Sequence, residues 1–310
     1  MRYVFPHFTP ACLLLVFLWQ SALAEEFHVY YLGGQSNMDG YGFVRDLPEE
    51  MKSSFDTTYI FHGNTSKDGQ PVDGRGVWSK LQAGHGVGFQ SDGKANKYSK
   101  RFGVELTFAK SILAANPDKK IAIIKYSRGG TSIAEEAAGG FGCWEPDFKQ
   151  GKGEGKGVNQ YDHFLATIRN ATAVSDIDGD GEKDKLIPAG IVWMQGESDA
   201  QSAEVAAKYE ANLKRLMDLI RASLRVDDLP VVIGRISDSG RDDKDGKVWD
   251  YGAELRAAQA AFVEQDEVAA IVNSTDEYGY SDPWHYDSAG YIDLGQKFAE
   301  AMLKLEPATK

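Results

Sequence analysis

The chain alternates between apolar, β-rich runs and longer amphipathic segments, and this alternation restricts its fold more than any other feature. Five runs are predicted to form strands, at residues 27–32, 120–126, 187–194, 230–236 and 268–273. Five segments have helical spacing of apolar residues, at 103–115, 160–173, 202–224, 252–265 and 288–305. Near-continuous apolar strands alternating with helices are typical of a parallel sheet covered on both faces. The sequence therefore predicts a three-layer α/β fold with a five-stranded parallel sheet.

Two glycine-rich stretches interrupt this alternation, residues 40–100 and 128–158. Loops of this length inside a compact domain usually have a function, as lids or as walls of a binding site. Each stretch follows a predicted strand. We therefore expect both to project from the carboxyl edge of the sheet, where open α/β folds bind ligands.

The first 24 residues have the three-part pattern of a secretory signal peptide. Arg2 precedes an apolar run from Ala11 to Trp19, and the small-residue tripeptide Ala22-Leu23-Ala24 ends the segment. A membrane anchor is the alternative, but the run is shorter than the ~20 residues that a spanning helix needs. We predict cleavage after Ala24, a secreted or periplasmic protein, and no membrane contact after cleavage. On length alone, residues 25–310 fit one large domain or two.

Charge and cysteine content exclude some classes of partner and of fold. The formal net charge is −12, and cleavage of the signal peptide makes it more negative because it removes the cation Arg2. Such an acidic chain disfavours nucleic acid and anionic lipid as partners. Cys143 is alone once Cys12 is lost, so no internal disulfide is expected. No histidine lies near Cys143 in the sequence, so we interpret it as a buried or idle thiol rather than a nucleophile.

Polar residues gather after four of the predicted strands. The clusters are "GGQSNM" at 33–38, "SRGGTS" at 127–132, "QGESD" at 195–199 and "DPWHYD" at 282–287. Because parallel strands end at the same edge of a sheet, we expect the four clusters to form one site.

The first and last clusters contain the groups needed for nucleophilic catalysis. A serine becomes a nucleophile when a base, oriented by a third group, removes its proton. His285 is the one histidine that follows a strand beside an acid and an aromatic residue. Asp282 can turn back onto its Nδ1 atom, whereas Asp287 is the rival partner that we expect to cap the helix at 288–305. The sequence predicts Ser36 as nucleophile, His285 as base and Asp282 as the acid that orients it.

An acyl-transfer site also needs hydrogen-bond donors for the developing oxyanion. The backbone amides of Ser36 and of Gly129 or Gly130 can supply two donors, because glycine lets the chain approach a ligand closely. The side-chain amide of Gln195 can supply a third. Taken singly, each glycine pair also fits a plain turn, and Gln195 and Glu197 fit helix caps; their joint placement favours a site.

The blocks "GGQSNM", "GGTS", "VWMQGESDA" and "DPWHYDSAGY" resemble, in order, those of the SGNH hydrolases. They are most similar to the branch with sialate O-acetylesterases and the acetylxylan esterases of carbohydrate esterase family six. The blocks span Gly33 to Gly290, so the resemblance implies a single SGNH-type esterase domain at 25–310.

This resemblance carries expectations about fold, chemistry and site. It implies a flavodoxin-like fold with strand order 2-1-3-4-5, and a serine esterase that removes acetyl groups from carbohydrate through an acyl-enzyme. By position, it assigns the triad above and an oxyanion hole of Ser36, Gly130 and Gln195, with no cofactor for catalysis. Gln195 stands where the wider superfamily has asparagine. We interpret Glu197 as an anchor of its loop.

The expected partner is an acetylated carbohydrate, either a polysaccharide or sialic acid. Trp284 and Trp144 are candidate platforms for stacking against sugar rings, and either can instead belong to the core. A non-catalytic glycan-binding protein on the same scaffold is an alternative. A lipase or thioesterase of this fold is another, disfavoured because the sequence offers no apolar lid.

A separate acidic segment, "DIDGDGEKDKL" at 176–186, resembles the first half of a calcium-binding loop. Acids alternate along it, with Gly181 in the sixth position; they are Asp176, Asp178, Asp180, Glu182 and Asp184. The twelfth position is Ile187, so the closing bidentate glutamate is missing and a solvated acidic turn is the alternative. Because the segment precedes a strand, we expect it at the edge opposite the site, where calcium would be structural.

Overall fold

The computed structural model describes Met1 and residues 24–64, 73–149 and 158–305. Residues 2–23, which hold most of the predicted signal peptide, therefore lie outside the described residues, as do parts of both glycine-rich stretches. Within the described ranges, no helix combines the length and the apolar character needed to cross a membrane.

A seven-stranded sheet forms the centre of the fold, in the order β11-β10-β9-β1-β8-β3-β4. Its strands are β1 (Glu26–Gly34), β3 (Thr58–His62), β4 (Ser79–Lys80), β8 (Lys120–Ser127), β9 (Lys185–Met194), β10 (Val231–Gly234) and β11 (Ala269–Val272). All neighbours pair in parallel except β3 and β4, which are antiparallel. The five predicted strands are confirmed, and so is their order.

The prediction of five strands is two strands too few. β3 pairs with β8 and β4 pairs with β3, which extends the sheet on one side. Both strands lie inside the glycine-rich stretch 40–100. β4 has only two residues, too few to show a period, and the five residues of β3 stand in a stretch with no helical pattern next to them.

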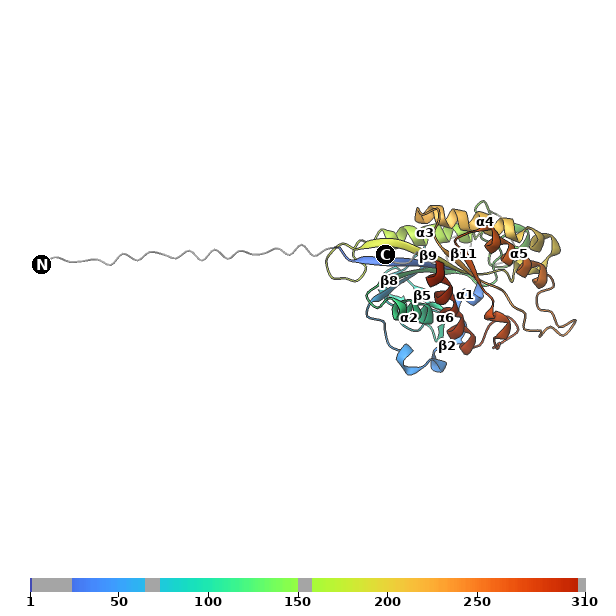
Figure 1. Ribbon diagram of the computed structural model, residues 1–310, viewed down its shortest axis with the longest axis horizontal. Helices are drawn as coiled ribbons and strands as arrows, with labels where there is room; N and C mark the ends of the chain where they lie inside the picture. Colours follow the sequence, from blue (N-terminus) through green and yellow to red (C-terminus); the bar gives the residue numbers. More distant parts are fainter. Residues whose placement is uncertain (2–23, 65–72, 150–157, 306–310) are drawn as a thin grey trace.

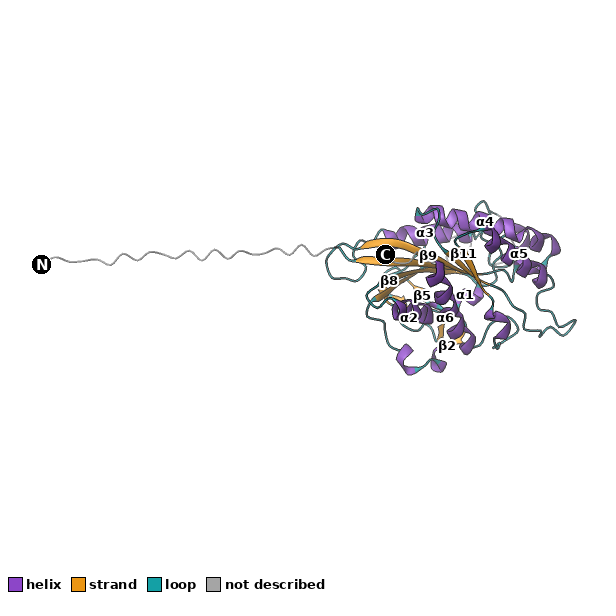
Figure 2. Cartoon of the chain, viewed as in Figure 1, coloured by secondary structure: helices purple, strands orange, loops and turns teal. Residues whose placement is uncertain are grey.

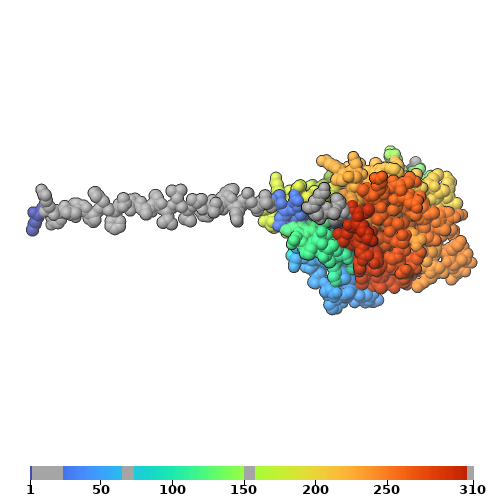
Figure 3. Space-filling model, viewed as in Figure 1, coloured from blue at the N-terminus to red at the C-terminus, as the bar shows by residue number. Residues whose placement is uncertain are grey.

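Helices cover both faces of this sheet, as Figure 1 and Figure 2 show. The long helices are α2 (Glu105–Ala115), α3 (Gln160–Thr172), α4 (Ala203–Leu224), α5 (Gly252–Gln265) and α6 (Ser288–Leu305), each within two residues of its predicted bounds. α3, α4 and α5 lie on one face, and α2 and α6 lie side by side on the other, where both reach the surface (Figure 3).

Shorter elements connect these layers. They are α1 (Ser36–Asp39), β2 (Gly42–Phe43), η1 (Val44–Asp46), η2 (Glu49–Met51), β5 (Gln90–Ser91), β6 (Asn96–Lys97), β7 (Arg101–Phe102), η3 (Glu135–Ala137), η5 (Asp199–Gln201) and η6 (Ser274–Glu277).

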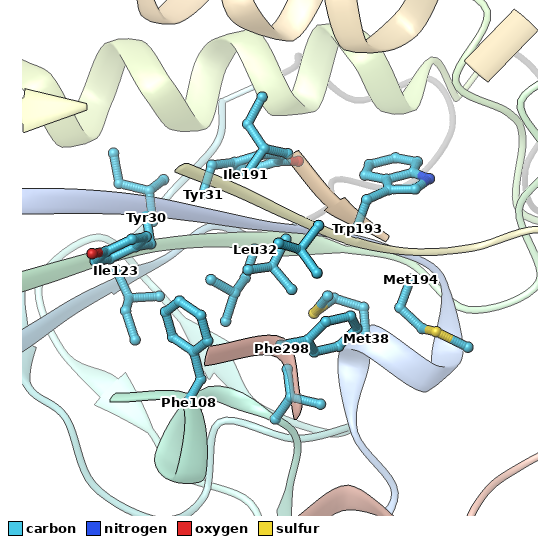
Figure 4. Packing of buried hydrophobic residues seen from close by; sticks show 14 of the residues in the cluster. Tyr30, Tyr31, Leu32, Met38, Phe108, Ile123, Ile191, Trp193, Met194 and Phe298 are labelled. Atoms are coloured by element: carbon cyan, nitrogen blue, oxygen red, sulfur yellow. The ribbon is translucent and has the colours of Figure 1, made fainter. Parts of the chain in front are cut away.

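The central strand β1 is buried on both sides, which explains its continuous apolar run. Successive side chains of a strand point to opposite faces. Tyr30 packs edge-on against Phe108 of α2, with ring centroids 5.1 Å apart, while Tyr31 packs against Phe164 of α3 at 4.8 Å. Figure 4 shows Tyr30 and Tyr31 within this packed interior.

The three central strands end at the same level. Gly34 pairs in register with Ser127 of β8 and with Met194 of β9. A Cβ atom on Gly34 would lie 2.0 Å from the carbonyl oxygen of Met194, and its φ of 140° is one that side-chain-bearing residues rarely adopt. Glycine at position 34 therefore lets β1 turn into the segment that holds Ser36.

Candidate active site

Ser36 is the first residue of α1, at the carboxyl end of the central strand. It is largely buried, with 6% of its surface exposed, and its hydroxyl has no hydrogen-bond partner within the described residues. As the first helical residue, it has a backbone amide without an intrahelical acceptor. Both the hydroxyl and the amide are thus available to a reacting group.

His285 and Asp282 form a hydrogen-bonded pair on the loop before α6. Nδ1 of His285 lies 2.7 Å from Oδ2 of Asp282, and Oδ1 of Asp282 accepts the amides of Trp284 and His285 at 2.8 and 2.9 Å. Burial raises the pKa of Asp282, but these hydrogen bonds outweigh it and leave the pKa below its usual value. With Nδ1 held by a carboxylate, Nε2 is the nitrogen left for proton exchange.

The other neighbours of His285 fix its position. Its ring stacks on Tyr41 with centroids 3.5 Å apart and an interplanar angle of 5°. Asp287 accepts the amide of Gly290 at 2.8 Å, the contact expected of a residue that caps α6. Tyr41 was missed at the level of sequence, because a single tyrosine in a glycine-rich stretch has no local signal.

Asn37 connects the serine turn to the histidine loop. Its Nδ2 donates to the carbonyl of Trp284 at 3.2 Å, and its Oδ1 accepts the amide of Tyr286 at 3.5 Å and the hydroxyl of Tyr291 at 2.8 Å. Trp284 and Tyr286 flank His285, so the residue after Ser36 is bonded to the backbone on both sides of the histidine. The structure thus brings Ser36 and His285 into one site.

Asp39 distinguishes between the two glycines of the second cluster. The amide of Gly129 donates to Oδ2 of Asp39 at 2.9 Å, and Ser127 donates to Oδ1 at 2.5 Å. The amide of Gly130 has no acceptor among the described residues. A Cβ atom on Gly129 would lie 3.1 Å from the Cβ of Ser36, so this loop passes directly beside the serine. Gly130 therefore keeps a free donor and Gly129 does not.

Gln195 does not have the free amide that the sequence led us to expect. It is fully buried, and its Nε2 lies within hydrogen-bond distance of Asp199 at 2.6 Å, of the carbonyl of Thr131 at 3.1 Å and of Gln35 at 3.3 Å. The expectation that Gln195 donates to an oxyanion is therefore wrong in this arrangement. The buried carboxylate of Asp199, four residues further along the chain, accepts the hydrogen bond from this amide instead.

Gln35, the residue before Ser36, is the side-chain amide that remains available. Its Oε1 accepts the amides of Gly196 and Ser198 at 3.4 and 3.3 Å, which holds the side chain in place. Its Nε2 has no partner within the described part of the chain, although the residue is only 3% exposed.

Glu197 anchors the third cluster to the serine turn. Its Oε1 accepts Nδ2 of Asn37 at 2.7 Å, and burial raises its pKa to about 7. Burial also raises the pKa of Asp199, to about 6, while that carboxylate accepts the amides of Ile133 and Ala134. These contacts agree with the interpretation of Glu197 as an anchor.

The two tryptophans predicted as sugar platforms differ in their exposure to solvent. Trp284 is half exposed, beside His285, and stays a candidate. Trp144 is fully buried, packs edge-on against Trp193 at 4.9 Å and donates to Thr131, so its assignment as a platform is wrong. The glycine-rich surroundings of Trp144 suggested an exposed loop, but the indole faces the core.

Cys143 is buried, and burial raises the pKa of its thiol to about 12. It therefore stays protonated at neutral pH, which agrees with its interpretation as an idle thiol.

A cavity of about 920 Å³ adjoins the site. Asp39, Ser127 and Arg128 line it near the serine, and Phe89 and Phe141 line it further away. Much of its wall comes from the glycine-rich stretches, as expected for loops at this edge.

The acidic loop lies before β9, at the opposite edge of the sheet. Carboxylate oxygens of Asp176, Asp178 and Asp180 lie within 4.8 Å of one another, and those of Glu25, Asp178 and Asp184 form a second such group. Glu182 belongs to neither group. Calcium binding at this loop stays a prediction.

Comparison with known proteins gives a family and a fold. The family described as "Carbohydrate esterase, sialic acid-specific acetylesterase" matches residues 26–304. Among curated protein sequences, none matches this chain significantly.

Three solved structures share the fold at low sequence identity. A protein from Arabidopsis thaliana is 19% identical with a TM-score of 0.61, over 91% of this chain and 99% of its own. A carbohydrate acetylesterase from Xanthomonas citri is 19% identical with a TM-score of 0.58, over 90% and 56%. NanS is 15% identical with a TM-score of 0.53, over 91% and 98%.

Proposed function

The chain belongs to the carbohydrate esterase family of sialic acid-specific acetylesterases, and we propose that it is an exported serine esterase that removes O-acetyl groups from carbohydrate. The observation that carries this proposal is the connection made by Asn37. It bonds the backbone on both sides of His285, whose Nδ1 is held by Asp282, and this supports a pairing of the unpartnered Ser36 hydroxyl with an oriented imidazole.

The reaction proceeds through an acetyl-enzyme. Oγ of Ser36 attacks the acetyl carbonyl while Nε2 of His285 takes its proton. The tetrahedral intermediate collapses as His285 returns the proton to the departing sugar oxygen. A water molecule, deprotonated by His285, then attacks the acetyl-enzyme, and acetate is released as His285 returns the proton to Oγ of Ser36. Asp282 keeps the imidazole in one orientation and stabilises its protonated form.

The oxyanion is stabilised by the amides of Ser36 and Gly130, with Nε2 of Gln35 as the third donor in place of Gln195. The support is that these donors have no acceptors in the described chain, whereas Gly129 and Gln195 do. Removing one such donor lowers kcat by about 100- to 1,000-fold in a serine hydrolase.

Acetate release tests this proposal. The protein is incubated with an activated acetyl ester and with a panel of acetylated xylan, pectin and sialosides, and acetate is quantified. We expect turnover that the Ser36→Ala variant abolishes without a change in melting temperature. Most of the activity surviving in that variant would rule out the mechanism. Glycan binding without any acetate release would favour the alternative of a non-catalytic glycan-binding protein.

Export is part of the proposal and rests on residues 1–24. Expression of the full chain with its N-terminal segment is expected to yield extracytoplasmic protein that begins at Glu25. An intact N-terminus on cell-associated protein would contradict it.

A further inference from the structure

The cavity lies next to the residues that hold the glycine loop against Ser36, although Ser36 itself is not among its lining residues. Asp39 and Ser127, which hold the glycine loop against Ser36, line its inner end, whereas His285 and Trp284 do not line it. Its volume of about 920 Å³ is near the upper end of the ~300–1,000 Å³ found for small-molecule sites. It is therefore placed and sized for the sugars that adjoin the acetylated one.

The charges that line the cavity are unequally compensated. The acids are Asp39, which accepts Ser127 and Gly129, and Asp92, which accepts the amides of two following residues. One cation, Arg75, pairs with Asp73 at 2.6 Å. The side chains of the other two cations, Lys97 and Arg128, form no ion pair or hydrogen bond within the described ranges. Both unpaired charges in the lining are therefore positive.

Arg128 is the better placed of the two. It lies between Ser127 and Gly129, on the loop that passes beside Ser36, whereas Lys97 is on the exposed strand β6. Its guanidinium lies 4.6 Å from the ring centroid of Phe141. Stacking of this kind restricts the side chain and leaves its planar N–H donors free for a carboxylate.

Asp39 lines the cavity with Arg128, and the charge of Arg128 acts on it, so it is the acid that could compete for the guanidinium. Burial raises the pKa of Asp39, by more than the hydrogen bonds from Ser127 and Gly129 and the positive charges of Lys125 and Arg128 lower it. Both oxygens of Asp39 already accept hydrogen bonds, and no ion pair joins it to Arg128. The guanidinium is thus left to bind a ligand.

We propose that Arg128, stacked on Phe141, binds the carboxylate of an acidic sugar next to the acetylated residue. The substrate would then be an O-acetylated acidic oligosaccharide or polysaccharide rather than a neutral one. The carboxylate can belong to a uronic acid or to a sialic acid, and the chemistry of recognition is the same. This inference rests on the proposed esterase function. The net charge of −12 repels polyanions at long range, so recognition depends on this local cation.

Matched substrates test the proposal. Three O-acetylated oligosaccharides are compared: one with a uronic acid beside the acetylated sugar, the same compound with its carboxyl group reduced to an alcohol, and one with a sialic acid beside the acetylated sugar. We expect kcat/KM to be about tenfold higher for at least one carboxylated compound than for the reduced one, the size of one charge-assisted hydrogen-bond pair. Whichever carboxylated compound is preferred, the one with uronic acid or the one with sialic acid, identifies the source of the carboxylate.

The Arg128→Gln variant should bring this ratio close to one, and Arg128→Lys should give an intermediate value. Arg45→Gln is the matched control, because Arg45 also stacks on an aromatic ring, Phe43 at 4.3 Å, but does not line the cavity. Its ratio should equal that of the wild type. A wild-type ratio near one, or an Arg128→Gln ratio equal to that of the wild type, would overturn the proposal.

A binding experiment separates failure of this inference from failure of the esterase function. The deacetylated acidic oligosaccharides are titrated into the Ser36→Ala protein and into Ser36→Ala combined with Arg128→Gln. About tenfold weaker binding to the second protein supports the subsite even if no acetate is released. Equal affinities would overturn it, and equal melting temperatures would show that both proteins are folded.

Discussion

Acidic side chains gather at both edges of the sheet, and the two groups have different partners. At the carboxyl edge, the carboxylates accept hydrogen bonds from residues far away in the sequence. Asp39 accepts one from Ser127, Glu197 one from Asn37 and Asp199 one from Ile133, over separations of 88, 160 and 66 positions. In the acidic loop, the carboxylates accept amides of the same turn. Asp176 accepts Gly179, three positions away, and the longest such bond, from Ile177 to Asp184, spans seven.

The difference shows which acids build the site. At the carboxyl edge Glu197 and Asp199 are buried and Asp39 is half-buried, removal from water raises the pKa of each, and they connect the ends of separate strands. Those in the loop shape only their own turn. We therefore expect substitutions in the first group to alter catalysis, and substitutions in the second to alter local stability and ion binding.

The largest expected effect within this comparison is that of Asp39→Asn. The amide keeps one acceptor but places an NH₂ group against Ser127 or Gly129, so the loop that carries Gly130 moves. We predict that kcat for an activated acetyl ester falls by about 100-fold, the cost of a misplacement of about 1 Å. Glu204→Gln, on the exposed start of α4, is the control and should retain wild-type kcat. An unchanged kcat in Asp39→Asn would end the distinction between the two groups.

A smaller effect is expected on the pH dependence of stability. Burial raises the pKa of Glu197 from 4.5 to about 7, so the folded state binds the proton more tightly than the unfolded state. Its stabilising contribution is complete below pH 4.5 and is lost as the pH rises through about 7. The melting temperature of the Glu197→Gln variant should therefore fall less between pH 4.5 and 8 than that of the wild type. Parallel curves for the two proteins would contradict this assignment.

The part of the site that was predictable from sequence is the part encoded locally. Strand and helix positions follow from apolar periodicity, and Asp282 lies only three residues from His285. Asp39, Tyr41 and Gln35 were missed because their partners are distant in the sequence. Gln195 was misassigned for a related reason. No pattern in the third cluster indicates that Asp199 takes up its amide.

Burial of loop residues was the other source of error. Trp144 and β3 both lie in glycine-rich stretches that suggested exposed loops, yet both are part of the packed interior. Whether an aromatic residue faces solvent or the core depends on the surface it meets, here Trp193 of β9. A sequence alone does not contain that pairing.

The smallest expected effect concerns the acidic loop. If it binds calcium, a chelator should lower the melting temperature by a few degrees, and added calcium should restore it. The Asp176→Asn variant should have lost this response while keeping its esterase activity. A melting temperature that chelator leaves unchanged would identify the loop as a turn that satisfies its own carboxylates.

The central claim is that Ser36 is an activated nucleophile, and covalent labelling tests it most directly. A fluorophosphonate is added to the folded protein, and the adduct is located by peptide mass spectrometry. We predict a single adduct on Ser36, strongly slowed in the His285→Ala variant because the base is gone. No adduct, or an adduct on a different serine at the wild-type rate, would contradict the account.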